Sequence, residues 1–186
     1  NSVDHLGDSQ LYTIINPVES FAIDPRRMYR CINQSFSLFG SAPYGFSEAI
    51  KQNAERFVQL PFSDYRKNFL NLFRQRHAKK TLNYLCKEGL IQQLIPSLKQ
   101  LDLNEDEISW FVNVCKRLDQ TDPLSIKNEY NFNQIICLFL APVLKKKMNT
   151  QHKMGLQANI DEIIDEMFLP FAEKLTEQQR KIMSDL

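Results

Sequence analysis

Apolar side chains recur at intervals of three or four residues along most of this chain, with polar side chains between them. That spacing gathers apolar residues on one face of a helix, whereas a half-buried strand requires alternation at every second position. No stretch alternates for long enough to predict a strand. The pattern therefore predicts an all-α fold, an irregular bundle of about seven to nine helices. Ile135 to Leu144 is apolar nearly all round and predicts the most buried helix, at the centre of the bundle.

Residues typical of helix ends bound several of these segments. Asp24 predicts an N-cap and Pro25 the first position of a helix that ends at Gly40 in a left-handed conformation. Trp110 and the thirteen Phe residues follow the apolar faces and are predicted to lie in the core. Lys145 to Lys147 predict the C-terminal end of a helix, where positive charges interact favourably with the helix dipole. The remaining signals are caps at Ser47 and Ser63, capping boxes at Asn104/Glu107 and Thr176/Gln179, and a stop at Gly89.

The same pattern divides the chain into three regions. Residues 1–22 mix turn-forming residues with isolated apolar ones and predict an irregular lead-in segment. Residues 23–98 predict a helical region with a basic surface, and residues 99–186 predict a C-terminal helical region. At 186 residues the chain is long enough to build a core of its own.

Positive charge is concentrated in the first half of a chain whose formal net charge is only +1. Between Asp24 and Lys87, twelve Lys and Arg residues stand against four Asp and Glu residues, a net charge of +8. Residues 155–186 hold seven acidic and three basic residues, a net charge of −4. The first half should therefore attract a polyanion, and the last quarter should not.

One part of the basic half is a candidate RNA-binding surface. A single strand binds Lys and Arg through its phosphates and aromatic rings through its bases, and Tyr65 and Tyr84 lie among the basic residues. A solvated helix face is the alternative interpretation of the same charges. The candidate RNA-binding residues are Arg66, Lys67, Arg74, Arg76, Lys79 and Lys80.

Asp24, Arg27 and Arg30 are candidate nucleotide-binding residues. Arg26, Arg27 and Arg30 place three positive charges near the positive end of a helix, which is unfavourable unless an anion is close. Asp24 is the only acidic residue between Glu19 and Glu48. A carboxylate can accept a hydrogen bond from the amine of a base, and a guanidinium can donate to ring nitrogens or phosphate. The alternative is a capped helix whose arginines form salt bridges with neighbouring residues.

No catalytic or metal-binding pattern is recognisable. Cys31, Cys86, Cys115 and Cys137 lack zinc-ligand spacing and predict buried free thiols, as in a cytoplasmic protein. The three acidic residues at 105–107 belong to the start of a helix, where negative charges interact favourably with the helix dipole. They are therefore not predicted to bind a metal. The three histidines have no Ser or Cys partner at a recognisable spacing, and no apolar run is long enough to span a bilayer.

The segment Asp24-Pro-x-Arg27-Met-x-Arg30 resembles the Asp-Pro-x-Arg-Met-x-Arg helix of bacterial poly(A) polymerases (polynucleotide adenylyltransferases) and the related CCA-adding tRNA nucleotidyltransferases. The resemblance covers most of residues 6–175, rests on the order of several motifs and is closer to the poly(A) polymerase branch. The other matching segments are Leu11 to Pro17, Leu60-Pro61, the predicted helices 63–73 and 78–87, Gly89-Leu90 and Leu94 to Pro96.

The resemblance implies both a fold and a function. The fold would be that of a poly(A) polymerase C-terminal body, with residues 23–98 as its neck and body. The chain would contribute nucleotide selection and RNA binding to ATP-dependent 3′ polyadenylation. The catalytic head, which uses ATP and Mg²⁺, would lie outside this chain. The chain is thus expected to be a fragment that has no cofactor of its own and no adenylyltransferase activity alone. The implied partners are RNA, ATP through the head, and RNA-decay proteins, with no membrane.

A second interpretation remains open. Ile23 stands where the family usually has an acidic residue, and Asn33 and Gln34 stand where it usually has an Arg-Phe pair. These differences fit a non-catalytic helical adaptor or protein-binding module descended from the same family.

Overall fold

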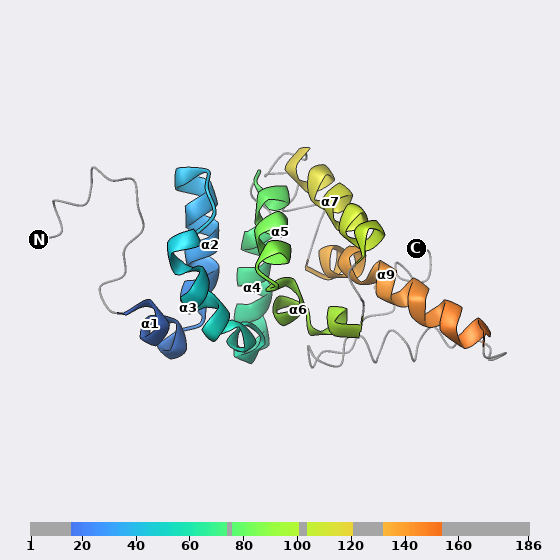
Figure 1. Ribbon diagram of the computed structural model, residues 1–186, viewed down its shortest axis with the longest axis horizontal. Coiled ribbons are helices and arrows are strands. Elements are labelled where there is room, and N and C mark those ends of the chain that lie inside the picture. The colour runs from blue at the N-terminus through green and yellow to red at the C-terminus, as the bar shows by residue number, and fades with distance from the viewer. Residues whose placement is uncertain (1–15, 74–75, 101–103, 121–131, 154–186) are drawn as a thin grey trace, which may run out of the picture.

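The computed structural model describes residues 16–73, 76–100, 104–120 and 132–153, and all regular elements in these ranges are helices (Figure 1). The ranges contain no strand, so the all-α class is confirmed. Several predicted features fall on other residues and lie outside the described part of the chain. They are the part of the predicted C-terminal helical region beyond residue 153, the capping box at Thr176/Gln179 and the acidic last quarter.

The first described element is a helix in a region where the pattern predicted none. α1 spans Pro17–Ile23. Asn16 caps it, because its Oδ1 accepts a hydrogen bond from the backbone N–H of Val18 at 2.9 Å, and Pro17 stands in the first turn, where an N–H has no helical partner. The expectation of an irregular lead-in is therefore wrong for residues 17–22. Seven residues are too few for an apolar period to emerge, but the Asn-Pro pair was a usable start signal.

The helix α2, Arg26–Phe39, begins and ends as predicted. Asp24 caps it, since its Oδ1 accepts the backbone N–H of Arg26 at 3.1 Å, and Pro25 already has helical dihedral angles. Gly40 ends the helix with φ 64°, a left-handed conformation that glycine adopts without strain. The buried face consists of Met28, Tyr29, Cys31, Ile32, Ser35 and Phe36.

The segment after Gly40 is more broken than the pattern predicted. The helix that was expected to begin at Ser47 ends before Asn53, whose side-chain amide donates to the carbonyls of Ala49 and Val18. Ser47 makes no capping hydrogen bond, so that expectation is wrong; its Oγ lies 3.1 Å from the hydroxyl of Tyr84. The elements here are η1 (Tyr44–Phe46), α3 (Ser47–Gln52) and η2 (Ala54–Gln59).

The helices α4 (Phe62–Phe73) and α5 (Ala78–Lys87) follow, and α4 packs against α2, α5 and α9. α4 begins one residue before Ser63, so Ser63 is not its cap. Gly89 ends α5 with φ 70°, as predicted. The next elements are α6 (Ile91–Leu94), η3 (Pro96–Gln100), α7 (Glu105–Gln120) and α9 (Phe132–Lys153).

The capping box that begins α7 is confirmed. Asn104 Oδ1 accepts the backbone N–H groups of Asp106 and Glu107, and Glu107 Oε2 accepts the backbone N–H of Asn104 at 3.1 Å. Lys145 to Lys147 do not end a helix, because α9 continues to Lys153.

Side chains from both predicted helical regions join one cluster of buried apolar residues. Its aromatic part links α4 to α9: the ring centroid of Phe69 lies 5.4 Å from Phe132, and that of Phe73 lies 5.0 Å from Phe139. Residues 135–144 include seven that are at most 5 % exposed, so the prediction of a buried helix is confirmed.

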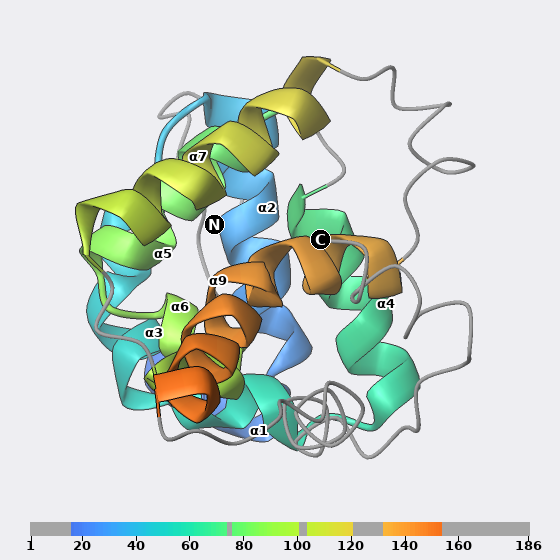
Figure 2. The ribbon, with the colours of Figure 1, turned by 90° about the vertical axis from the view of Figure 1, so that its right-hand side faces the viewer.

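The predicted central position of that helix is wrong. α9 packs against α4, α7 and η3 and lies at one end of the described helices, with its C-terminal half projecting away from them (Figures 1 and 2). Its first half is apolar all round because these three neighbours cover it from different sides.

Trp110 of α7 does not lie in the core as predicted; it is 41 % exposed and has a polar role. Its indole Nε1 donates to the carbonyl of Leu138 in α9 at 2.8 Å. Pro142, four residues further along α9, has no N–H, so the Leu138 carbonyl lacks its usual helical donor. Trp110 thus satisfies an acceptor that the proline leaves open.

Candidate nucleotide and RNA-binding surface

The three candidate nucleotide-binding residues meet at the corner between α1 and α2. Asp24 ends α1, where its backbone N–H donates to the Ser20 carbonyl, and its side chain caps α2. The Nη2 of Arg30 lies 3.1 Å from Asp24 Oδ2, and the Nε of Arg27 lies 3.8 Å from the same oxygen. The Nε of Arg26 lies 2.8 Å from Asp24 Oδ1. One carboxylate therefore faces three guanidinium groups.

Arg27 is also tied to α1. Its Nη1 donates a 2.7 Å hydrogen bond to the hydroxyl of Ser20, a side chain that is 2 % exposed in total. The side chain of Arg27 is itself 42 % exposed, so it is not enclosed by these contacts. Ser20 was not among the predicted site residues, and α1 had to be recognised before it could be placed beside Arg27.

A second acid reaches this cluster from α4. Arg26 Nη1 lies 3.6 Å from Asp64 Oδ2. Asp24 is the only acidic residue near the arginines in sequence, but the fold brings a second one to Arg26. No local pattern could have found Asp64, because forty residues and several helix ends separate it from Asp24.

The surroundings of Asp24 favour its ionised form. Burial by itself would raise the pKa of this carboxyl, but the hydrogen bonds from Arg26 and the charges of Arg26 and Arg30 outweigh burial and lower the pKa. The carboxylate is 15 % exposed and already accepts several hydrogen bonds, so it is an anchor for the arginines more than a free acceptor.

The cluster is suited to bind an anion. The three arginines together with Asp24 and Asp64 have a net charge of +1. A guanidinium has five N–H donors, so the contacts of Arg27 and Arg30 leave donors that can reach a phosphate or a ring nitrogen. A carboxylate surrounded by guanidinium groups is unsuited to hold Mg²⁺, and the described residues contain no group of three or more His, Cys, Asp or Glu side chains placed to do so.

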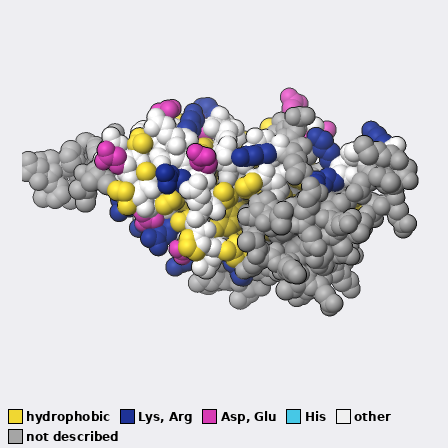
Figure 3. Space-filling model, turned by 90° about the horizontal axis from the view of Figure 1, so that it is seen from below, with side chains coloured by type: hydrophobic (Ala, Val, Ile, Leu, Met, Phe, Trp, Pro, Cys, Tyr) yellow, Lys and Arg dark blue, Asp and Glu magenta, His cyan; other side chains and the backbone are white. Residues whose placement is uncertain are grey.

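The candidate RNA-binding residues fall into two groups. Arg66 and Lys67 are exposed in the first half of α4, and Arg76, Lys79 and Lys80 are exposed around the start of α5. Arg74 lies outside the described residues. Seven residues of helix separate Arg66 from the end of α4, or about 10 Å along its axis. On the face shown in Figure 3, the visible Lys and Arg side chains are interrupted by acidic and apolar ones rather than forming a continuous stripe.

The α4 group borders a hollow of about 420 Å³. This hollow combines apolar and cationic walls, a composition that suits a ligand with both a flat apolar part and a negative charge. Among the described residues it is lined by Phe62, Ser63, Arg66, Lys67 and Leu70.

Tyr65 and Tyr84 cannot stack on bases, so that part of the prediction is wrong. Each is only 2 % exposed. The Tyr65 hydroxyl donates to the carbonyl of Leu94 at 2.9 Å, and the Tyr84 hydroxyl pairs with Ser47. Both rings belong to the aromatic core. For Tyr65, its helical spacing with Phe69 on one face of α4 already indicated this.

The predicted free thiols are confirmed. Cys31, Cys115 and Cys137 are buried and Cys86 is half-buried. Burial raises the pKa of Cys31 and Cys137 to about 12 and that of Cys86 to about 11, so these thiols are neutral and poor nucleophiles at pH 7.

No model of a known protein family matches this chain, and no curated protein is similar enough to serve as a relative. Among the described helices, none has the combination of length and apolar character needed to cross a bilayer.

Proposed function

We propose that this chain is the C-terminal helical part of a polynucleotide adenylyltransferase (poly(A) polymerase). It contributes nucleotide selection and RNA binding, while a head outside the chain performs ATP-dependent transfer to the 3′ end of RNA. The observation that carries the proposal is Arg27, whose guanidinium is oriented by Ser20 and Asp24 while its side chain as a whole remains 42 % exposed. A fixed, accessible guanidinium can hold a nucleotide with little loss of side-chain entropy.

The chemistry is assigned to the head for a physical reason. Phosphoryl transfer of this kind requires carboxylates that hold Mg²⁺ and neutralise developing charge. Asp24 is committed to three arginines and cannot serve in that way. The head supplies the metal and the triphosphate, and this chain supplies Arg27 and Arg30 as donors and the basic residues of α4 and α5 as contacts to the RNA backbone.

The test compares two arginines of the same cluster. In the natural protein that contains both a head and this chain, Arg27→Ala should reduce ATP incorporation into an RNA primer about ten- to a hundredfold, because a hydrogen bond from a charged group contributes about 1.5–3 kcal/mol. Arg26→Ala is the matched control, because Arg26 contacts the same Asp24 but stands outside the Asp-Pro-x-Arg-Met-x-Arg pattern. It should leave the rate nearly unchanged.

Thermal unfolding shows whether a variant loses activity through weaker nucleotide binding or through a less stable fold. Arg27→Ala should lower the free energy of unfolding by about 1 kcal/mol, because the buried Ser20 hydroxyl loses its partner, and the variant should remain folded at the temperature of the assay. Residues 1–186 alone, with ATP and Mg²⁺, should not extend the primer. Equal rates for the two alanine variants, or extension by the chain alone, would contradict the proposal.

A second function is favoured by one observation. Ile23, directly beside Asp24, is 72 % exposed, and an open apolar side chain next to a cluster of arginines fits a protein partner. On this interpretation the chain is a non-catalytic helical adaptor. A natural protein whose complete sequence contains no nucleotidyltransferase head, and which does not extend the primer, would favour it.

A further inference from the structure

An exposed aromatic ring lies beside α5 and has no part in the site described above. Tyr44, in η1, is 58 % exposed. Its ring is nonetheless fixed: the centroid lies 6.0 Å from that of the buried Tyr84, at an interplanar angle of 73°, and the Nζ of Lys87 lies 5.1 Å from it. A ring held by an edge-on neighbour and a cation loses little freedom when a ligand stacks on it.

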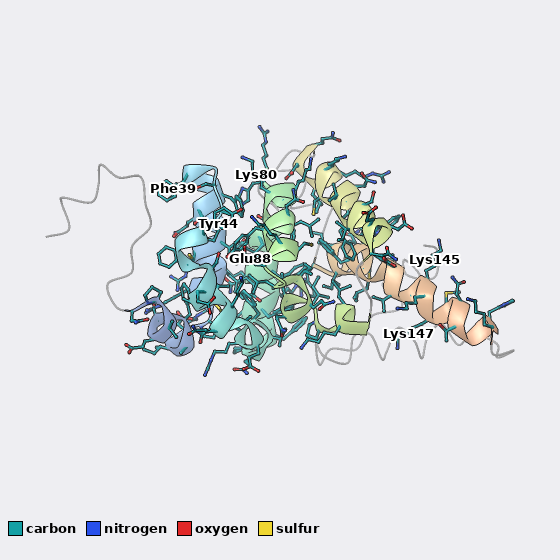
Figure 4. All side chains as sticks on the ribbon, in the orientation of Figure 1. Phe39, Tyr44, Lys80, Glu88, Lys145 and Lys147 are labelled. Atoms are coloured by element: carbon teal, nitrogen blue, oxygen red, sulfur yellow. The ribbon has the colours of Figure 1, made fainter. Side chains whose placement is uncertain are left out.

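Two lysines of α5 hold the segment that carries this ring. Lys80 and Lys87 are seven residues apart, which places them on one face of the helix about 10 Å apart along its axis. The Nζ of Lys80 donates to the carbonyl of Gly40 at 3.2 Å, and Lys87 lies over Tyr44. The chain from Gly40 to Tyr44 therefore runs beside α5 between the two ammonium groups. In Figure 4 the label of Tyr44 lies between that of Lys80, near the start of α5, and that of Glu88, just after its end.

The local charge is positive. Glu88, the acidic residue next to Lys87 in sequence, forms an ion pair with Lys51 at 2.6 Å. Lys80 and Lys87 contact a carbonyl and a ring, respectively, so neither is neutralised by the contacts that hold it. Lysines spaced along a helix beside a fixed, open ring match the two needs of a single nucleic-acid strand, which are cations for its backbone and a flat surface for its bases.

We propose that Tyr44, Lys80 and Lys87 form a binding site for single-stranded nucleic acid, in which a base stacks on Tyr44 and the flanking phosphates bind the two lysines. The proposal rests on the RNA binding included in the proposed function and names the ring that Tyr65 and Tyr84 cannot provide. It also extends the predicted basic surface along α5 to Lys87. An acidic peptide would use the lysines but has no comparable need for the ring.

The test uses two fluorescent probes of equal charge, a twelve-nucleotide oligoadenylate and a twelve-unit abasic strand, both titrated with residues 1–186. Tyr44→Leu should weaken oligoadenylate binding about fivefold or more and leave abasic binding unchanged. Tyr44→Phe keeps the ring and should bind oligoadenylate like the wild type. Lys87→Gln should make the slope of log K against log salt shallower by about 0.7, whereas Lys116→Gln, an exposed lysine of α7, should not.

Circular dichroism and thermal unfolding confirm that each variant is folded. Wild-type binding that Tyr44→Leu and Lys87→Gln leave intact would overturn this site while RNA binding elsewhere on the chain stands. Absence of oligoadenylate binding by the wild type would overturn the RNA-binding part of the proposed function together with this site. Competition by polyglutamate as effective as that by oligoadenylate would assign the lysines to an acidic protein segment and also overturn the proposal.

Discussion

Asp24 links two helices and three arginines through a single carboxylate. Its backbone ends α1, its Oδ1 caps α2, and its two oxygens face the guanidinium groups of Arg26, Arg27 and Arg30. The cap was predictable, because Asp before Pro is a local start signal. The sharing of one acid by three arginines was not, because it depends on the corner that α1 and α2 form.

Asp24→Asn separates these two roles. The amide can still cap α2, but it cannot neutralise the arginines, so we expect the free energy of unfolding at pH 7 to fall by about 1 kcal/mol, a value reduced by the exposure of the arginines. The folded-state pKa of Asp24 lies below the ordinary 3.8, so its contribution is complete above pH 3.8 and is lost as the pH falls through the lowered value.

Urea unfolding of both proteins between pH 3 and pH 7 measures this difference. The gap between wild type and Asp24→Asn should narrow below pH 3.8. Glu55→Gln, at an exposed position of η2, is the control and should show no such gap. A gap that stays constant down to pH 3 would contradict the ionic role.

At the scale of elements, some helix groups are satisfied by residues distant in sequence. The start of α5 has no cap of its own; instead Asp119 of α7 accepts the backbone N–H groups of Ala78 at 2.6 Å and Lys79 at 3.0 Å. In the same way Trp110 of α7 donates to the Leu138 carbonyl of α9. Both contacts tie α7 to a neighbouring helix, and neither leaves a signal in the local sequence.

A double-mutant cycle tests the link between Trp110 and Pro142. Trp110→Phe should cost about 1 kcal/mol of unfolding free energy, because the Leu138 carbonyl loses its donor. In a Pro142→Ala background the cost should be smaller, since the N–H of an alanine at this position can donate to Leu138 as in a regular helix. We expect a coupling energy of about 0.5 kcal/mol or more from urea unfolding of the four proteins. Equal costs in the two backgrounds would show that Trp110 acts through packing alone.

At the scale of the whole molecule, the class of fold and the buried faces could be predicted, and the arrangement could not. The 3.6-residue period is a local property, so the faces of α2, α4 and α5 followed directly from the sequence. Which helices meet is not local, and so the position of α9, the burial of Tyr84 and the exposure of Tyr44 required the structure. The candidate site divides in the same way: Asp24, Arg27 and Arg30 stand together in sequence, whereas Ser20 and Asp64 join them only through the fold.

The separation of the two basic groups leads to a prediction about strand length. Because about 10 Å of α4 lies between Arg66 and the start of α5, a short RNA should engage one group and a longer RNA both. With a two-nucleotide strand, which is too short to span this distance, the variants Arg66→Gln/Lys67→Gln and Arg76→Gln/Lys79→Gln should differ, with one of them retaining wild-type affinity. With a twelve-nucleotide strand, each pair should make the slope of log K against log salt shallower by about 1.4, from about 0.7 per contact.

Glutamine is preferred to glutamate in these pairs because Asp119 accepts the backbone N–H of Lys79, and an added carboxylate there would repel it. Fluorescence anisotropy at several salt concentrations gives the slopes, and thermal unfolding confirms that the variants are folded. If the two groups form one surface, neutralising both should reduce the magnitude of the twelve-nucleotide slope by about 2.8, the sum of the separate effects. A combined change no larger than that of one pair would show that the strand uses only one group, and that the two ends of α4 do not act together.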